Sequence, residues 1–196
     1  METTRYRPGF VDEVAELASL DDDIRERIEE VAEKTGFIPN VFLKLALRPG
    51  EFRAFMAYHD ALMAKESGLS KTEREMIVVV TSAANSCMYC VVAHGAILRI
   101  HSKNPALSDQ VATNYRLADL SPRQKAICAF ALKVASGAHL IDEEDYGALH
   151  DIGLSDEEIW DTGAIAAFFA LSNRMAGFTQ MMPNPEFYSM ARTKRT

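Results

Sequence analysis

Three serines in this sequence carry the signature of a helix start. Each is followed three residues later by a glutamate or a glutamine, in the pairs Ser70 and Glu73, Ser121 and Gln124, and Ser155 and Glu158. In such a capping box the serine oxygen accepts a backbone N–H of the first turn, and the Glu or Gln side chain accepts the N–H of the serine. The three boxes predict three helices, and no pattern of comparable strength predicts a strand.

The rest of the chain is also divided by helix boundaries. The acidic run 21–23 opens a helix that Gly36 closes. A further helix is expected over residues 51–67, where apolar side chains recur at helical spacing before Gly68. The β-branched run 76–80 resembles a strand, but it lies inside a capped stretch of helical length. We therefore predict an all-α fold.

Length and charge limit the class of protein. With 196 residues the chain is long enough for a sizeable core, and we predict one all-helical domain over residues 1–196. The net charge of −7 argues against binding to nucleic acid or to an anionic membrane surface. The N-terminal residues show no apolar signal-peptide core, so we expect a cytoplasmic protein.

A faint internal repeat relates residues 69–86 to residues 120–137 without gaps. On this interpretation residues 51–100 form the copy with the reactive side chains, and residues 120–178 form a degenerate second copy without a Cys-x-x-Cys pair. The alternative is that any two capped, buried helices look this similar. The sequence leaves both interpretations open.

Two of the three cysteines lie close together, in the segment SCMYCVVAHGA. Cys87, Cys90 and His94 occupy positions i, i+3 and i+7, which share one face of a helix. Ser86 is expected to cap a helix that starts at about Cys87, which puts both thiols in the first turn. Free backbone N–H groups and the helix dipole stabilise a thiolate there. His94 follows Cys90 by one turn, close enough to exchange a proton with it.

These residue types fit the reduction of a peroxide. The reaction needs a thiolate nucleophile, a proton donor for the departing alkoxide, and a second thiol that converts the sulfenic acid into a disulfide. Glu75 lies in the preceding helix, where the apolar run beside it indicates burial. It is the candidate carboxylate of a proton relay.

Other interpretations of the cysteine pair are open. A zinc site normally needs four ligands, and Cys87, Cys90 and His94 supply three; Cys128 or His59 could be a fourth only if the fold brought it close. A thioredoxin-type pair needs a βαβ context, which the helical pattern does not provide. Inert core cysteines are common, and Cys128 in the run AICAFAL is predicted to be one. His59 could face the site from the preceding helix, but we expect it to be a core or interface histidine.

Asn173 and Arg174 interrupt an otherwise apolar helix. A buried arginine usually has a carboxylate partner. We therefore expect Arg174 to form a structural or inter-subunit ion pair rather than an active-site wall.

On these residues, the sequence resembles the alkyl hydroperoxidase D-like and carboxymuconolactone decarboxylase-like superfamily. The resemblance rests on Glu75, Cys87, Cys90 and His94 at their spacing, preceded by LSKTERE. The segments GFIPNVF and LSNRMAGF extend it to the branch of peroxidase-related enzymes, so it covers most of the chain. It implies a multi-helix bundle that assembles as a homo-oligomer (a dimer, a trimer or a hexamer), with the active site near a subunit contact.

The resemblance also implies a role for each site residue. Cys90 falls on the peroxidatic cysteine and Cys87 on the resolving cysteine, while Glu75 and His94 fall on the proton relay. The best-known members have a second histidine where this chain has Tyr89. A tyrosine titrates near ~10 and is a poor base at pH 7, so we expect Tyr89 to act only as a hydrogen-bond donor. We therefore expect peroxidase activity that is slower than in those members, or differently tuned.

The sequence therefore predicts an antioxidant enzyme, a thiol-dependent peroxidase that reduces organic hydroperoxides without a metal or a cofactor. Its predicted partners are the organic hydroperoxide, a dithiol or redox protein that restores the cysteine pair, and further copies of the chain. Two alternatives within the superfamily are a thiol–disulfide oxidoreductase that passes electrons to a separate peroxidase, and a decarboxylase-like enzyme. A fourth interpretation is a helical scaffold whose cysteines only sense redox state.

Overall fold

The computed structural model describes residues 6–193, and within this range the chain forms helices and turns but no strand. The all-α prediction is confirmed. The α-helices are α1 (Gly9–Asp12), α2 (Asp22–Thr35), α3 (Asn40–Leu45), α4 (Pro49–Met63), α5 (Lys71–Ala84), α6 (Met88–Ser102), α7 (Leu107–Asn114), α8 (Pro122–Gly137), α9 (Glu143–Asp151), α10 (Asp156–Phe178) and α11 (Glu186–Ser189), and the 3-10 helices are η1 (Leu17–Ser19) and η2 (Ala138–Leu140).

The predicted capping boxes form as expected. Ser70, Ser121 and Ser155 cap α5, α8 and α10, and each serine oxygen accepts the backbone N–H of the third helical residue. The side chain of that residue accepts the N–H of the serine in all three boxes. Asp142 forms a fourth box at the start of α9. These starts are local events, because donor and acceptor lie within one turn of chain.

Arg123 joins two of these helix starts. Its Nε lies 2.9 Å from Oε1 of Glu73, and its Nη2 lies 2.6 Å from Oε1 of Glu158. Both carboxylates belong to capping boxes and are largely buried. One guanidinium from α8 therefore neutralises the two carboxylates that cap the starts of α5 and α10.

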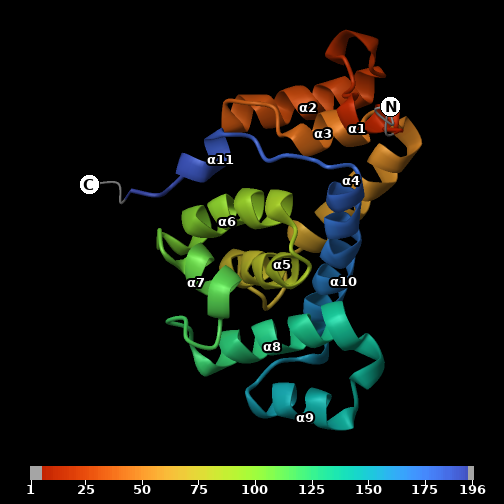
Figure 1. The fold of residues 1–196 in the computed structure, drawn as a ribbon. Coiled ribbons are helices and arrows are strands. Elements are labelled where there is room, and N and C mark those ends of the chain that lie inside the picture. The colour runs from red at the N-terminus through yellow and green to blue at the C-terminus, as the bar shows by residue number, and fades with distance from the viewer. Residues whose placement is uncertain (1–5, 194–196) are drawn as a thin grey trace, which may run out of the picture.

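Helix α5 forms the centre of the bundle. Its residues 76–79 are fully buried, and it packs against α6, α7, α8 and α10. In Figure 1 α5 lies in the middle of the molecule with these helices around it. Contact on all sides explains why a strand-like run is helical here: the packing of β-branched side chains offsets their small intrinsic cost in a helix.

Helices from the N-terminal and C-terminal parts of the chain lie over α6. Figure 1 shows α1, α2 and α3 together at one end of the molecule, beyond α6, and α8 and α9 at the other end. Helix α11 packs against α6. Phe187 of α11 meets Phe37 of the α2–α3 turn edge-on, with 4.9 Å between ring centroids. The helix that carries the cysteine pair is therefore covered by segments from both ends of the chain.

One predicted helix is misplaced. The helix expected over 51–67 spans Pro49–Met63 instead. Arg74 of α5 places its guanidinium at the end of α4, where it donates to the carbonyl oxygens of Leu62 and, at 3.0 Å, of Lys65. A side chain from the next helix thus satisfies carbonyls that a longer α4 would use itself.

The internal repeat stays a prediction. Its two segments form α5 and α8, which begin with similar capping boxes and pack against each other. Two unrelated buried helices would satisfy the same description. The single domain over residues 1–196 also stays a prediction.

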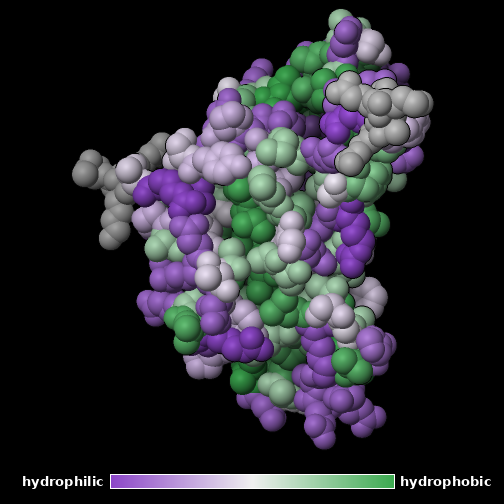
Figure 2. Space-filling view, viewed as in Figure 1, coloured by the Kyte–Doolittle hydropathy of each residue, from purple (hydrophilic) through white to green (hydrophobic). Residues whose placement is uncertain are grey.

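The surface of the described chain has an apolar band. Figure 2 shows hydrophobic residues down the middle of one face, between hydrophilic flanks. Helix α10 also exposes several large apolar side chains, namely Trp160, Leu171 and Phe178. Among the described helices, none is long and apolar enough to cross a membrane. Exposed apolar surface of this extent is typical of contacts with other molecules.

Candidate active site

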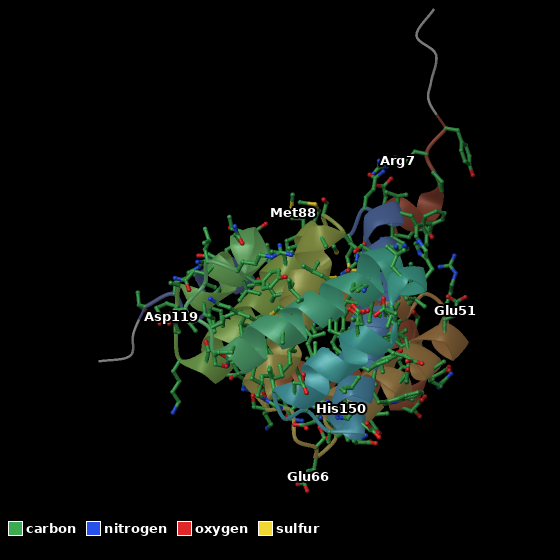
Figure 3. All side chains as sticks on the ribbon, turned by 90° about the horizontal axis from the view of Figure 1, so that it is seen from below. Arg7, Glu51, Glu66, Met88, Asp119 and His150 are labelled. Carbon is green, nitrogen blue, oxygen red and sulfur yellow. The ribbon has the colours of Figure 1, made fainter. Side chains whose placement is uncertain are left out.

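The cysteine pair lies at the N-terminal end of α6. Cys87 itself is the N-cap, and its Sγ accepts the backbone N–H of Cys90 at 3.4 Å. Ser86 was the expected cap; it instead adopts φ of 52° in the turn between α5 and α6, so that prediction is wrong by one residue. Both thiols are buried, whereas Met88 between them points outward (Figure 3) and is 56% exposed.

The two thiols affect each other's ionisation. Hydrogen bonds from the thiol of Cys90 and from its backbone N–H lower the pKa of Cys87 to about 6, against the opposing effect of burial. The same hydrogen bond between the thiols, together with burial, raises the pKa of Cys90. When the pair loses its first proton, the charge therefore rests mainly on Cys87, with the Cys90 thiol donating to it.

Access from the cavity favours Cys90 instead. Cys90 and His94 line a cavity of about 250 Å³, and Cys87 does not line it. Most of its walls are apolar side chains from helices spread over the chain, among them Val41, Phe42, Phe55, Ile97, Phe169 and Met190. Electrostatics and access thus favour different cysteines. Access is the stronger requirement for a nucleophile, because attack requires contact with the sulfur, whereas a proton moves easily between hydrogen-bonded thiols.

Glu75 and His94 form a hydrogen bond between α5 and α6. Nδ1 of His94 lies 2.9 Å from Oε2 of Glu75, and both side chains are largely buried. Because an ionised carboxylate only accepts hydrogen bonds, Nδ1 carries the hydrogen and Nε2 is left as the acceptor. Phe169 packs edge-on against the imidazole, with 4.7 Å between ring centroids. His94 is held ready to accept a proton, with a carboxylate to stabilise the imidazolium.

Helix α10 contributes two polar side chains close to the thiols. Neither was assigned to the site from the sequence. Ser172 Oγ lies 4.0 Å from the Sγ of Cys90. The amide of Asn173 donates to Ser82 Oγ at 2.9 Å and accepts from Asn85 Nδ2 at 3.0 Å. Hydrogen bonding from Asn173 favours the thiolate of either cysteine. The signal in the sequence was an asparagine inside an apolar helix.

The neighbouring Arg174 points away from the site. It is exposed, and its guanidinium donates to the backbone carbonyl of Ala170 in its own helix, at 2.5 Å. The structural ion pair is absent among the described residues, and the inter-subunit ion pair stays a prediction. Helix periodicity explains the difference, because Asn173 and Arg174 are consecutive and point in different directions from α10.

Tyr89 joins the cysteine turn to the N-terminal helices. Its hydroxyl oxygen accepts the backbone N–H of Val41, at the start of α3, at 3.1 Å. Burial raises the pKa of Tyr89 further above its usual value, so the phenol stays neutral. Tyr89 also lines the cavity. Its predicted role as a donor toward the substrate stays a prediction.

His59 reaches the cavity from α4. It lines the cavity together with Cys90 and His94, although the sequence placed it in the core or at an interface. Its imidazole packs on Phe169 with 6.3 Å between ring centroids. The sequence contained a weak signal, because His59 lies on the apolar face of α4 that turns toward the bundle.

The third cysteine lies apart from the cavity. Cys128 is fully buried in α8, and burial raises its pKa to about 12. An inert thiol is expected in such a place. Within residues 6–193, no group of three His, Cys, Asp or Glu side chains is arranged to hold a metal ion.

Comparisons with known proteins agree on one family. The model of the carboxymuconolactone decarboxylase family matches residues 49–133. A peroxidase-related protein from Ralstonia eutropha JMP134, described as having an alkylhydroperoxidase AhpD core, is 62% identical over 93% of this chain and 96% of its own, with a TM-score of 0.92. A peroxidase-related protein from Silicibacter sp. TM1040 is 39% identical over 98% of this chain and 100% of its own, with a TM-score of 0.88.

More distant structures share only the fold. The debrominase Bmp8 is 20% identical over 87% of this chain and 90% of its own, with a TM-score of 0.71. A search among curated protein sequences gave no match.

Proposed function

Because this chain belongs to the alkyl hydroperoxidase D-like and carboxymuconolactone decarboxylase superfamily, we propose that it is a thiol-dependent peroxidase that reduces organic hydroperoxides. One observation carries the proposal. Cys90 and His94 face the same apolar cavity, Glu75 lies behind His94, and Cys87 is hydrogen-bonded to Cys90. This arrangement supplies a nucleophile, a proton relay and a resolving thiol around one small cavity.

The proposed reaction begins when the pair of thiols gives one proton to Nε2 of His94 and the remaining proton moves to Cys87, so that Cys90 carries the charge. The thiolate of Cys90 then attacks the terminal oxygen of the hydroperoxide. An S–O bond forms, the O–O bond breaks, and its electron pair leaves with the alkoxide, which takes the proton from His94 and becomes an alcohol. Glu75 stabilises the imidazolium in between. Cys90 is left as a sulfenic acid.

Cys87 completes the cycle in this proposal. Its sulfur attacks the sulfur of the Cys90 sulfenic acid, an S–S bond forms, and the hydroxide that leaves takes up the proton of Cys87 to become water. A dithiol or a redox protein then reduces the disulfide. We also propose that the protein acts in the cytoplasm, where a free cysteine pair stays reduced. The exposed apolar side chains of α10 support a homo-oligomer.

Two alternatives fit the structure less well. A thiol–disulfide relay makes no use of the apolar cavity that Cys90 and His94 line, whereas a hydroperoxide would occupy it. A carboxylated decarboxylase substrate needs a cation to bind it. Among the described residues around the cavity, Arg27 is the only arginine or lysine, and its guanidinium is bound to Asp60 at 2.9 and 2.7 Å. A small, uncharged hydroperoxide suits the cavity better than either.

The test is peroxide turnover together with mass spectrometry of the cysteines. We expect the purified protein to reduce cumene hydroperoxide with a dithiol, and Cys90→Ser to lose this activity. Cys87→Ser should accumulate a sulfenic acid at position 90. Cys128→Ser is the matched control and should keep full activity. Turnover by Cys90→Ser, or a sulfenic acid on Cys87, would overturn the assignment of the attacking cysteine.

A further inference from the structure

His59 lies between two cavities. One is the cavity of about 250 Å³ that Cys90 and His94 line. The other, of about 320 Å³, is more polar and is lined by Glu75 and Lys71, among others. Among the described residues, His59 alone lines both cavities. It is half-buried and comes from α4, a helix that carries none of the other polar side chains lining the cavity of Cys90.

The tautomer of His59 is fixed by its neighbours. Nδ1 of His59 lies 3.0 Å from Oδ1 of Asp60, and Arg27 of α2 holds that carboxylate with two hydrogen bonds. Because the carboxylate only accepts, Nδ1 carries the hydrogen and Nε2 is an acceptor. Nε2 has no hydrogen-bond partner among the described residues. Burial lowers the pKa of His59, more than Asp60 raises it, so the imidazole is neutral at pH 7.

A neutral acceptor in an apolar cavity selects a particular kind of ligand. Such a nitrogen can accept the hydrogen bond of an O–H group on a ligand that enters the cavity. His94 also contributes an acceptor nitrogen, but in the proposed function that nitrogen receives a proton from the pair of thiols. His59 has no such task. The two imidazoles can therefore have different roles: His94 moves a proton, and His59 accepts the hydrogen bond of a hydroxyl group.

We propose that Nε2 of His59 accepts the hydrogen bond of the O–H group of an apolar hydroperoxide, and of the alcohol formed from it, in the cavity that Cys90 lines. The inference rests on the proposed function for the identity of the hydroperoxide. The O–H proton is not transferred in this step: it stays on the terminal oxygen, which becomes the oxygen of the Cys90 sulfenic acid. His59 thus orients the oxygen that Cys90 attacks. A peroxide without an O–H group lacks this contact.

The test uses two unreactive probes of nearly equal shape. The alcohol 2-phenylpropan-2-ol carries the O–H group, and tert-butylbenzene has a methyl group in its place. Dissociation constants for both are measured by NMR titration of the reduced protein and of His59→Phe. One hydrogen bond is equivalent to about tenfold in binding. We expect the preference for the alcohol to fall about tenfold in His59→Phe, while tert-butylbenzene binding changes much less.

Two further variants separate the hydrogen bond from other effects. His59→Gln keeps an acceptor and should keep most of the preference for the alcohol. His101→Phe is the matched control, because His101 lines only the more polar cavity and should leave both constants unchanged. An unchanged preference in His59→Phe would overturn the inference. Neither probe reacts with a thiol, so the result does not depend on turnover; absence of turnover in the wild type would count against the proposed function alone.

Discussion

Nδ1 of His94 lies 2.9 Å from Oε2 of Glu75, although the two residues are 19 positions apart and belong to different helices. Both side chains are largely buried, and Phe169 packs against the imidazole from α10. This hydrogen bond links His94, which lines the apolar cavity, to a carboxylate on the central helix α5. Its geometry leads to the first of five predictions.

Replacing Glu75 by glutamine tests the relay. Glu75→Gln keeps a hydrogen-bond acceptor for His94 but removes the negative charge that stabilises the imidazolium. We expect kcat for cumene hydroperoxide to fall about 100-fold, the lower range for loss of general acid–base catalysis. The protein should still fold, because the amide fits the same space.

The matched control for this variant is Glu66→Gln. Glu66 is exposed in the segment between α4 and α5 and projects outward in Figure 3, so its loss should leave kcat unchanged. Full activity in Glu75→Gln would show that His94 works without the carboxylate.

The thiol pair predicts a characteristic pH profile. The pKa of Cys87 is lowered to about 6, so thiolate absorbance in the ultraviolet should rise through pH 6 and level off near pH 7. Cys90→Ala removes the donor and should move this rise toward ~8.5, the value for a free cysteine. Cys90→Ser keeps an O–H donor and should keep the rise near the wild-type pH. Because Cys128 is buried with a pKa of about 12, Cys128→Ala should leave the profile unchanged.

The same shift predicts how stability depends on pH. The folded pKa of Cys87 is below the value of ~8.5 for an unfolded cysteine, so ionisation stabilises the fold. This contribution is complete above the unfolded pKa and is lost as the pH falls through about 6. Urea unfolding should therefore show wild type gaining stability over Cys87→Ala between pH 6 and 8. A difference that stays constant over this interval would mean that the thiolate is not stabilised.

Tyr89→Phe should loosen the N-terminal helices. The variant removes the acceptor of the Val41 N–H and leaves that group without its partner. We expect the free energy of unfolding to fall by about 1 kcal/mol and amide hydrogen exchange at the start of α3 to become faster. Tyr188→Phe, at an exposed tyrosine of α11, is the control and should change neither quantity. Unchanged exchange at Val41 would show that Tyr89 does not hold α3 in place.

Arg123→Met should destabilise two helix starts at once. It leaves the carboxylates of Glu73 and Glu158 without their cation while keeping most of the side-chain packing. We expect a loss of about 2–3 kcal/mol in the free energy of unfolding, less than for a fully buried pair because Arg123 is partly exposed. The triple variant with Glu73→Gln and Glu158→Gln should recover part of this loss. No recovery would assign the effect of Arg123 to packing rather than to charge.

The starts of the main helices were predictable because they are local. Ser70, Ser121 and Ser155 find their partners three residues away, so the spacing in the sequence already contains the hydrogen bonds. Cys87, Cys90 and His94 follow the same logic, since helical periodicity puts them on one face. Only the exact cap was misjudged, because a cysteine rather than Ser86 accepts the first N–H.

Local sequence patterns were enough to predict that the chain is helical, where its capped helices begin, and that two thiols and an imidazole share one helix face. Which thiol meets the cavity depends on how the helices pack, and the same packing brings His59 from α4 and Asn173 from α10 to the site. Packing also decides where α4 ends, through a guanidinium from the next helix. Helix hydrogen bonds and caps reach only a few residues, whereas the walls of a cavity depend on how whole helices pack around the buried α5.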